Sequence, residues 1–165
     1  MDADAAAMIL TAWRTNARVT RFLVDKIPRD LWSAAIPNVP RRTFRSIAAH
    51  LHNSRCSWLK KLDVDVLAPV DSHRVTQRQL VAALDKSARG MEALLRCGLE
   101  NGGTIPPTKA YVWRNLPLDV AHVLSYFAAH EGHHRGQIVL AARQLGRRLP
   151  VSVTGGLWQF RSFST

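Results

Sequence analysis

The spacing of apolar residues constrains the fold of this 165-residue chain more than any other feature. Apolar side chains recur at intervals of three and four residues, which places them on one face of a helix. No alternating pattern of the kind found in β-strands competes with this spacing. Helices are predicted over residues 4–27, 43–62, 76–97 and 118–145, and 155–163 is a candidate for a further short helix. The sequence therefore predicts an all-α protein built as an antiparallel four-helix bundle.

Several helix ends are marked by residues that start or stop helices. Thr76 opens the third predicted helix, since T-Q-R-Q fits a capping box in which side chains bond to free backbone amides. The fourth helix follows Pro117 and stops before Gly146, which has the place of a C′ residue. The proline-rich connection at 104–117 is too long for a tight helix hairpin. No linker or low-complexity tract divides residues 1–165, which predicts a single domain.

The composition argues against a membrane protein. Hydrophobic residues make up 47% of the chain, enough for one core. No apolar run approaches the roughly 20 residues that a membrane-spanning helix needs. The start MDADAAAMILTAW is acidic and lacks the basic region of a signal peptide. We therefore expect a cytoplasmic protein in which Cys56 and Cys97 are buried free thiols.

The chain is strongly basic, with 23 lysines and arginines against 12 acidic residues and a net charge of +11. Such a surplus is typical of proteins that bind nucleic acid, anionic lipid or acidic substrates. No basic arm, zinc-finger spacing or aromatic RNA-binding motif accompanies it. A solvated basic surface is therefore the favoured interpretation, and nucleic-acid binding is the alternative. Two small arginine clusters stand out, Arg41, Arg42 and Arg45, and Arg143, Arg147 and Arg148.

The stretch HEGHHRGQI, residues 130–138, gathers metal-binding side chains on the fourth predicted helix. An α-helix turns by about 100° per residue. This turn places His130 and His134 on the apolar stripe, turns His133 away from it and leaves Glu131 near its edge. Two inward imidazoles one helical turn apart can bind one ion together. The alternative is two core histidines with separate hydrogen-bond partners, and a shared metal is the favoured interpretation.

A third ligand has to come from elsewhere in the chain. H-E-x-x-H also begins the motif of zinc proteases, but residues 135–165 contain no histidine, aspartate or glutamate to complete it. On the second predicted helix His50 lies beside the apolar face, whereas His52 points the opposite way. His73 lies in a loop, and His122 lies on the outer flank of its helix. His50 is thus the predicted third ligand, and three imidazoles leave coordination positions for water or substrate.

The segments SIAAHLHNSRCSWLKKL, residues 46–62, and YFAAHEGHHRGQIVLAARQLG, residues 126–146, resemble the DinB family, also called DinB/YfiT-like metalloenzymes. The resemblance covers essentially the whole chain. It implies an up-down-down-up four-helix bundle that binds a divalent metal, commonly zinc or nickel, through His50, His130 and His134. It also implies a homodimer. The implied activity is that of an S-transferase using small cytosolic thiols such as bacillithiol or mycothiol, or of a metal-dependent hydrolase.

We therefore predict a metalloenzyme in which the ion acidifies a bound thiol or water that attacks a small-molecule substrate. Glu131 is a candidate for a hydrogen-bond acceptor beside the metal or a general base. It is equally a candidate for a structural ion pair with Arg135 or another basic residue. Tyr111, Trp113 and Arg114 are candidates for lining the mouth of the site and binding the cofactor, or for simple packing.

Two other functions stay open at the level of the sequence. One is a nucleic-acid-binding protein that uses the basic surface. The other is a module that binds metal or a small ligand without catalysis. The homodimer is further indicated by Trp158 and Phe160 in the C-terminal tail, because one small core does not fully bury such large aromatics.

Overall fold

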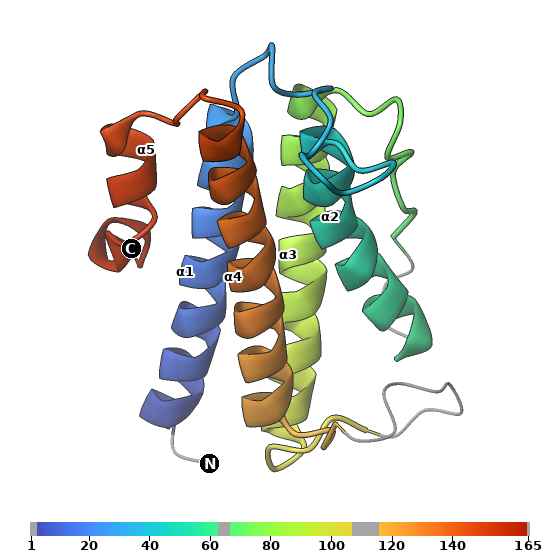
Figure 1. Cartoon of the computed structure of the whole chain (residues 1–165). Coiled ribbons are helices and arrows are strands. Elements are labelled where there is room, and N and C mark those ends of the chain that lie inside the picture. The colour runs from blue at the N-terminus through green and yellow to red at the C-terminus, as the bar shows by residue number, and fades with distance from the viewer. Residues whose placement is uncertain (1–2, 63–66, 107–115, 165) are drawn as a thin grey trace.

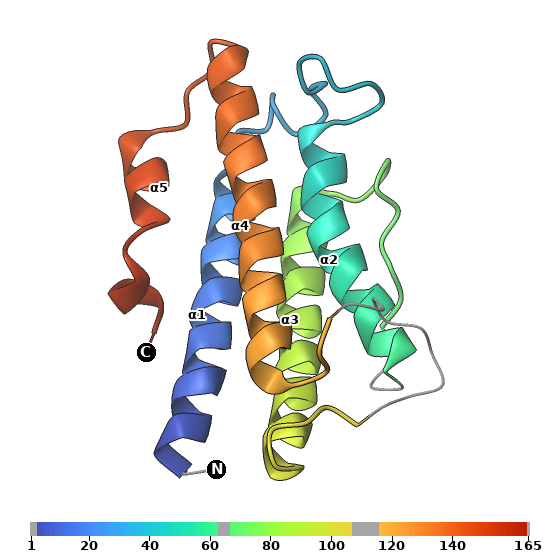
Figure 2. The same cartoon turned by 60° about the horizontal axis from the view of Figure 1, so that its bottom comes forward.

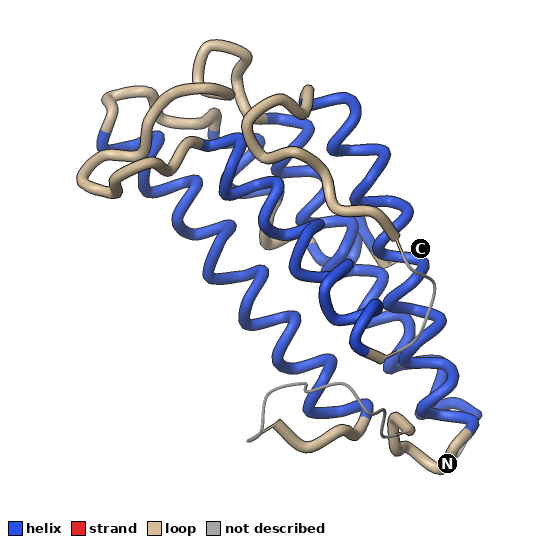
Figure 3. Tube along the Cα trace, turned by 90° about the vertical axis from the view of Figure 1, so that its right-hand side faces the viewer, coloured by secondary structure: helices blue, strands red, loops and turns tan. Residues whose placement is uncertain are grey.

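The computed structural model describes residues 3–62, 67–106 and 116–164. Its elements are α1 (Ala3–Lys26), α2 (Phe44–Lys61), α3 (Gln77–Glu100), α4 (Val120–Gln144), the short α5 (Val151–Gly156) and a 3-10 turn, η1 (Phe160–Phe163). Figure 3 shows only helices and loops in the described part of the chain. The predicted all-α four-helix bundle is confirmed.

The four long helices follow an up-down-down-up course. In Figure 1, α1 and α4 run upward from the end of the bundle near the N-terminus, whereas α2 and α3 run downward. The turned view in Figure 2 shows the same directions. Because α2 and α3 point the same way, the connection between them has to return along the length of the bundle, as residues 67–76 do in Figure 1. This order places α2 beside α4, although α3 separates them in the chain.

The core confirms the predicted stripes of the first two helices. On the stripe predicted for the first helix, Trp13, Ala17, Thr20 and Val24 are buried on α1 and Ile27 directly after it, whereas Ile9 is only partly buried. The stripe predicted for the second helix is buried throughout, at Phe44, Ile47, Leu51, Trp58 and the C-cap residue Leu62. The buried face of α4 ends before the last residue of the predicted helix. Leu145, the last residue of the predicted fourth helix, is 39% exposed because α4 ends at Gln144 and Leu145 serves as its C-cap.

Helix ends confirm several predicted signals. The capping box at Thr76 is present, with the side chains of Thr76 and Gln79 each bonded to the other's backbone amide. Gly146 follows α4 with a φ of 71°, the left-handed conformation expected at C′. The fourth helix begins at Val120 rather than directly after Pro117, because the Asp119 side chain caps it.

The predicted short helix at 155–163 is wrong in its position. A helix of six residues starts at Val151, directly after Pro150, and ends at Gly156. The fixed φ of proline suits the start of a helix, which explains the earlier beginning. Only residues 160–163 of the predicted range are helical again, as the 3-10 turn η1.

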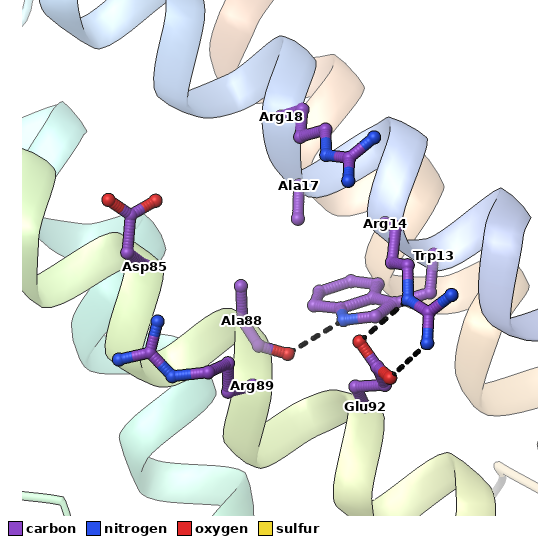
Figure 4. Close-up of a pocket in the computed structure, with 8 residues that line it drawn as sticks. All are labelled: Trp13, Arg14, Ala17, Arg18, Asp85, Ala88, Arg89 and Glu92. Atoms are coloured by element: carbon purple, nitrogen blue, oxygen red, sulfur yellow. Dashed lines mark hydrogen bonds and ion pairs between the residues drawn. The ribbon is translucent and has the colours of Figure 1, made fainter. Parts of the chain in front are cut away.

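Helices α1 and α3 are joined by directed polar contacts as well as by apolar packing. Figure 4 shows the Trp13 indole donating to the carbonyl of Ala88 at 2.9 Å and Arg14 bonding to Glu92 through two nitrogens. Arg21 and Asp85 add a second ion pair along the same helix pair, at 3.1 Å. These contacts fix the register of the two helices that carry none of the predicted metal ligands.

The cysteine prediction holds at one of the two positions. Cys56 on α2 is buried, whereas Cys97 is exposed in the last turns of α3, which continues three residues beyond its predicted end. In the part of the chain that the structure describes, none of the helices has the length and apolar character needed to cross a bilayer.

Candidate metal centre

Three histidines from two helices meet between α2 and α4. His50 lies in the second turn of α2, and His130 and His134 lie one turn apart near the middle of α4. The Nε2 atom of His130 is 3.2 Å from Nε2 of His50 and 3.2 Å from Nε2 of His134. One ring nitrogen from each of the three lies within 4.8 Å of the others. The structure thus brings together the three predicted ligands, each of them half-buried.

The spacing of the three nitrogens fits a shared metal ion. A tetrahedral ion bound at about 2.0–2.1 Å has ligand atoms roughly 3.3 Å apart. Hydrogen bonds alone satisfy this cluster poorly, because Nε2 of His130 carries either one hydrogen or one lone pair and faces two neighbouring nitrogens at 3.2 Å. An ion accepts all three lone pairs together. The donor set therefore fits a divalent metal, without distinguishing which one.

The surroundings keep the three rings neutral, as metal binding requires. Burial, as the main cause, and the neighbouring His134 and His50 together lower the pKa of His130 to about 4. Burial is also the main cause that lowers the pKa of His50 and of His134. The positive charge of Arg42 contributes to both shifts in the same direction. At neutral pH each ring therefore has a lone pair available for an ion.

Gln137 fixes the orientation of the His134 ring. Its side-chain oxygen accepts a hydrogen bond from Nδ1 of His134 at 2.7 Å, and its amide nitrogen donates to Nε2 of His133 at 2.9 Å. The hydrogen on Nδ1 leaves the lone pair of His134 on Nε2, which faces the cluster. His133 is exposed and lies outside the cluster of three, off the buried stripe as predicted. Its ring meets that of His134 edge-on, with centroids 5.1 Å apart, and its Nε2 accepts the hydrogen bond from the Gln137 amide.

Aromatic rings enclose His130. Tyr126 stacks on it with ring centroids 5.8 Å apart and an angle of 12° between the planes, and Phe127 meets it edge-on at 6.5 Å. The second ring nitrogen of His130, Nδ1, is buried and has no hydrogen-bond partner in the described part of the chain. The position of the His130 ring is thus set by packing, whereas the orientation of the His134 ring is set by a hydrogen bond.

Glu131 lies in the centre of the bundle rather than at the edge of the apolar stripe, and it is completely buried. Its two oxygens accept hydrogen bonds from Nε and Nη2 of Arg55 at 2.8 and 3.0 Å, a bidentate ion pair. The guanidinium of Arg55 also lies 5.0 Å from the ring of Trp13. The structural alternative predicted for Glu131 is thus present, with Arg55 as the main partner. The general-base role stays a prediction.

The Arg55–Glu131 pair connects all four long helices. From α1, Asn16 and Thr20 donate to the Glu131 carboxylate at 3.0 and 2.7 Å. From α3, the carbonyl of Leu84 and the hydroxyl of Ser87 accept from Arg55 at 3.1 and 3.3 Å. Arg135, the partner named from the sequence, lies 3.9 Å from the carboxylate and donates instead to the side chains of Asn16 and Thr20. Both oxygens of this buried carboxylate thus accept hydrogen bonds, Oε1 from Arg55 and Oε2 from Arg55, Asn16 and Thr20.

A pocket of about 420 Å³ opens beside the cluster. His134 and Gln137 lie at its wall, together with Arg42 from the connection between α1 and α2. The remaining lining residues are Ile36, Pro37, Asn38, Val39, Ile47, Leu140, Ala141 and Gln144. A small molecule in this pocket can therefore reach a ligand of the candidate metal. The pocket between α1 and α3 in Figure 4 has a volume of about 250 Å³ and is lined by none of the three histidines.

The other histidines lie apart from the cluster. His52 points away from it, as predicted, but is buried, with its ring nitrogen 3.2 Å from the Cys56 sulfur. His73 and His122 are exposed. His122 bonds to the Asp119 carboxylate at the start of α4. Tyr111, Trp113 and Arg114, the candidates for the mouth of the site, lie outside the described residues.

Sequence reasoning missed three side chains at or near this site: Gln137, Arg42 and Arg55. For Gln137 and Arg55, the spacing along the helix could have indicated a role. Gln137 stands three residues after His134, the spacing at which helical side chains touch. Arg55 stands four residues after Leu51 and three before Trp58, so it lies on the apolar face of α2, where a charge needs a buried partner. Arg42 had no such signal, because its position depends on the course of the connection before α2.

Comparison with known proteins adds one finding. A family model described as the DinB family matches residues 1–157. No curated protein matches the chain, and no solved structure does.

Proposed function

We propose that this chain, which belongs to the DinB family, is a metal-dependent enzyme that activates a thiol or water for attack on a small-molecule electrophile. The observation that carries the proposal is the convergence of His50, His130 and His134, whose neighbouring Nε2 atoms are 3.2 Å apart. A structural metal site is usually closed by four protein ligands, whereas three ligands leave a position for an exchangeable molecule. The adjoining pocket gives such a molecule access to His134.

The residues of the chain have separate roles in this proposal. The three neutral imidazoles hold the ion without adding negative charge, and Gln137 keeps the lone pair of His134 on the correct nitrogen. When bound, the ion supplies positive charge that acidifies a thiol or water at its open position. The Arg55–Glu131 network holds α2 and α4 at the spacing the cluster needs. Imidazole suits both zinc and nickel, and we propose one of these two as the metal.

Metal content tests the first half of the proposal. Protein purified without added metal should carry or take up about one divalent ion per chain, and His134→Ala should abolish this binding. His52→Ala and His133→Ala are matched controls that should keep a full complement, because neither ring belongs to the cluster. Elemental analysis of the four proteins decides the point. Equal loss of metal in all three variants would contradict the assignment of His134 as a ligand. The metal-free protein should keep its helical circular dichroism, since apolar packing supplies most of the stability of a bundle.

A panel of thiols and electrophiles tests the second half. We expect turnover that depends on a small thiol, or hydrolysis without one, and near-complete loss of rate when any one ligand is replaced by alanine, because the ligands act as a unit. Full metal content with no turnover over a broad panel would instead identify a module that binds metal or a small ligand without catalysis.

Binding of nucleic acid or another polyanion is the second candidate function, and one observation favours it. Arg29, Arg45, Arg74 and Arg78 line a single pocket of about 350 Å³ together with Trp32. The Nε atom of Arg45 is buried and has no hydrogen-bond partner in the described part of the chain. Guanidinium groups gathered in this way are typical of phosphate recognition.

Fluorescence anisotropy with a labelled single-stranded oligonucleotide separates the two candidates. A polyanion-binding protein should show affinity that falls steeply with salt, with each lost phosphate contact reducing the salt slope by about one. Arg78→Gln should then weaken binding, and His134→Ala should leave it unchanged. Binding that is weak at low salt and insensitive to Arg78→Gln would exclude this function.

A further inference from the structure

The pocket beside His134 has an apolar wall. Ile36 and Val39 come from the connection between α1 and α2, Ile47 from the first turn of α2, and Leu140 and Ala141 from α4. The polar side chains among them, Asn38, Gln137 and Gln144, are all neutral amides. A ligand that fills about 420 Å³ in these surroundings gains by burying an apolar segment against the wall.

Arg42 is the one charged residue that lines this pocket in the part of the chain that the structure describes, and no acidic residue lines it there. The described residues also offer its guanidinium no ion pair. The pocket therefore has a fixed positive charge on its wall and no negative side chain to balance it.

The segment that carries Arg42 is held in a defined shape. The amide of Ile36 donates to the carbonyl of Arg42 at 2.8 Å, and the amide of Arg42 donates to the carbonyl of Val39 at 3.3 Å. Asn38 and Arg41 adopt positive φ values of 58° and 61°, which turn the chain back on itself. Since the turn is closed by backbone bonds, the base of the Arg42 side chain is held beside the pocket before a ligand arrives.

We propose that this pocket binds a small molecule with an anionic group and an apolar segment, and that Arg42 recognises the anionic group while the other end of the molecule reaches the metal position at His134. The inference rests on the proposed metal-dependent function and names the class of molecule that this site takes. Guanidinium binds carboxylate and phosphate oxygens through paired, directional hydrogen bonds, which a neutral hydroxyl cannot match.

Two probes of equal length test the proposal. They are 6-mercaptohexanoate and 6-mercaptohexanol. Both have the thiol and the apolar chain, and they differ in the charge of the group at the far end. Titration calorimetry on cobalt-loaded protein measures the affinity of each, and the visible spectrum of the cobalt reports whether the thiol reaches the metal. For the wild-type protein we expect the carboxylate to bind about fivefold more tightly, the scale of an ion pair near the surface, and the preference to shrink as salt is added.

Arg42→Gln and Arg41→Gln are the matched variants. Arg41 is exposed, adjacent in the chain and absent from the pocket wall, so its replacement changes the net charge equally. The preference for the carboxylate should vanish in Arg42→Gln and persist in Arg41→Gln, with cobalt content unchanged in both. A preference that survives Arg42→Gln, one lost equally in both variants, or no binding of either probe overturns the inference. Failure of the wild-type protein to bind cobalt overturns the proposed function instead.

Discussion

Gln137 bonds to His134, a candidate ligand, and to the exposed His133, and the contact with His134 is the one that bears on metal affinity. Partners that orient a metal-binding histidine typically contribute 10–100-fold to affinity. We therefore expect Gln137→Ala to weaken metal binding by about that factor while the ion still binds at one per chain. Competition with a chelator of known affinity measures the change. Gln144→Ala, which alters the same pocket without touching a ligand, should bind metal as the wild type does.

The buried Arg55–Glu131 pair contributes to the stability of the fold rather than to metal affinity. Glu131→Ala leaves the Arg55 charge buried without its partner, and removing one member of such a pair costs about 3–5 kcal/mol of unfolding free energy. Urea denaturation measures this loss. The double variant Arg55→Met/Glu131→Leu should recover much of it, because an apolar pair of similar volume removes the unpaired charge. A Glu131→Ala protein as stable as the wild type would contradict the structural role.

The double variant also decides the remaining question about Glu131. A general base contributes roughly 10²–10⁴-fold to the rate. If the folded double variant keeps its metal and its turnover, Glu131 is not the base and the metal alone activates the nucleophile. A lower rate in the double variant calls for the single variant Glu131→Gln, which keeps Arg55: a rate lower by that factor, with normal metal content and stability, would support the catalytic role predicted from the sequence.

The lowered pKa values of the ligands predict how the stability of the metal-free protein depends on pH. In the unfolded chain a histidine has its ordinary pKa near 6.5, whereas in the folded protein the pKa of His130 is about 4. As the pH falls below 6.5, the unfolded chain takes up protons that the folded protein does not. The free energy of unfolding should therefore decrease from about pH 6.5 towards pH 4.

Urea denaturation of the metal-free protein at pH 7 and pH 5 checks this dependence. His130→Gln should lose less stability over the same interval, because it lacks a group whose pKa is lowered to about 4 in the folded protein. Wild type and variant that change in parallel would show that the dependence comes from other groups. Metal binding should weaken over the same interval, since protons compete for the same lone pairs.

At the scale of the helices, replacing either of two glycines by alanine should change the free energy of unfolding, in opposite directions. A Cβ at Gly98 on α3 would lie 2.6 Å from Cγ1 of Val120 and 3.0 Å from Cγ1 of Ile105, too close for a stiff branched side chain to accommodate. Gly98→Ala should therefore cost about 1–3 kcal/mol. A Cβ at Gly136 on α4 would meet nothing within 4 Å, so Gly136→Ala should add roughly 0.5–1 kcal/mol through helix propensity. Thermal denaturation followed by circular dichroism measures both, and equal signs would contradict the packing.

The helices show which features the sequence made predictable. Long amphipathic segments with strong end signals, such as the capping box at Thr76, were predicted within a few residues, because periodicity and capping are local properties. The short α5 was misplaced, since six residues give too few turns to establish a period. The meeting of His50, His130 and His134 was predictable because each lies at the apolar face of its own helix. The burial of Glu131 and the placing of Arg42 depend on how segments distant in the chain come together, which local patterns do not contain.

For the whole molecule we propose a homodimer formed through the face that α1, α4 and the C-terminal tail share. Met8, Trp158 and Phe160 are 72%, 82% and 49% exposed. A groove of about 790 Å³, lined by residues of α1, α4 and the tail, lies along this face. Exposed apolar side chains beside a long groove are typical of a surface that another chain covers.

Solution scattering at micromolar concentration tests the dimer. Wild-type protein should scatter with twice the mass of one chain, and Trp158→Glu should reduce it to a monomer while metal content stays unchanged. Val151→Glu is the control, since Val151 is equally exposed on the tail, at 84%. It lines neither the groove nor a neighbouring pocket between the tail and α4 to which Trp158 and Phe160 contribute. A monomeric wild-type protein would exclude the proposal.

The origin of the ligands on α2 and α4 orders events while the chain is made. His50 leaves the ribosome 80 residues before His130. At typical synthesis rates of about 5–20 residues per second this is a delay of roughly 4–16 s. During that time the nascent chain contains only one of the three imidazoles of the cluster. If the cluster binds an ion as we propose, full coordination has to wait until His130 and His134 on α4 have been made, so a bound metal would mark a chain whose fourth helix is in place.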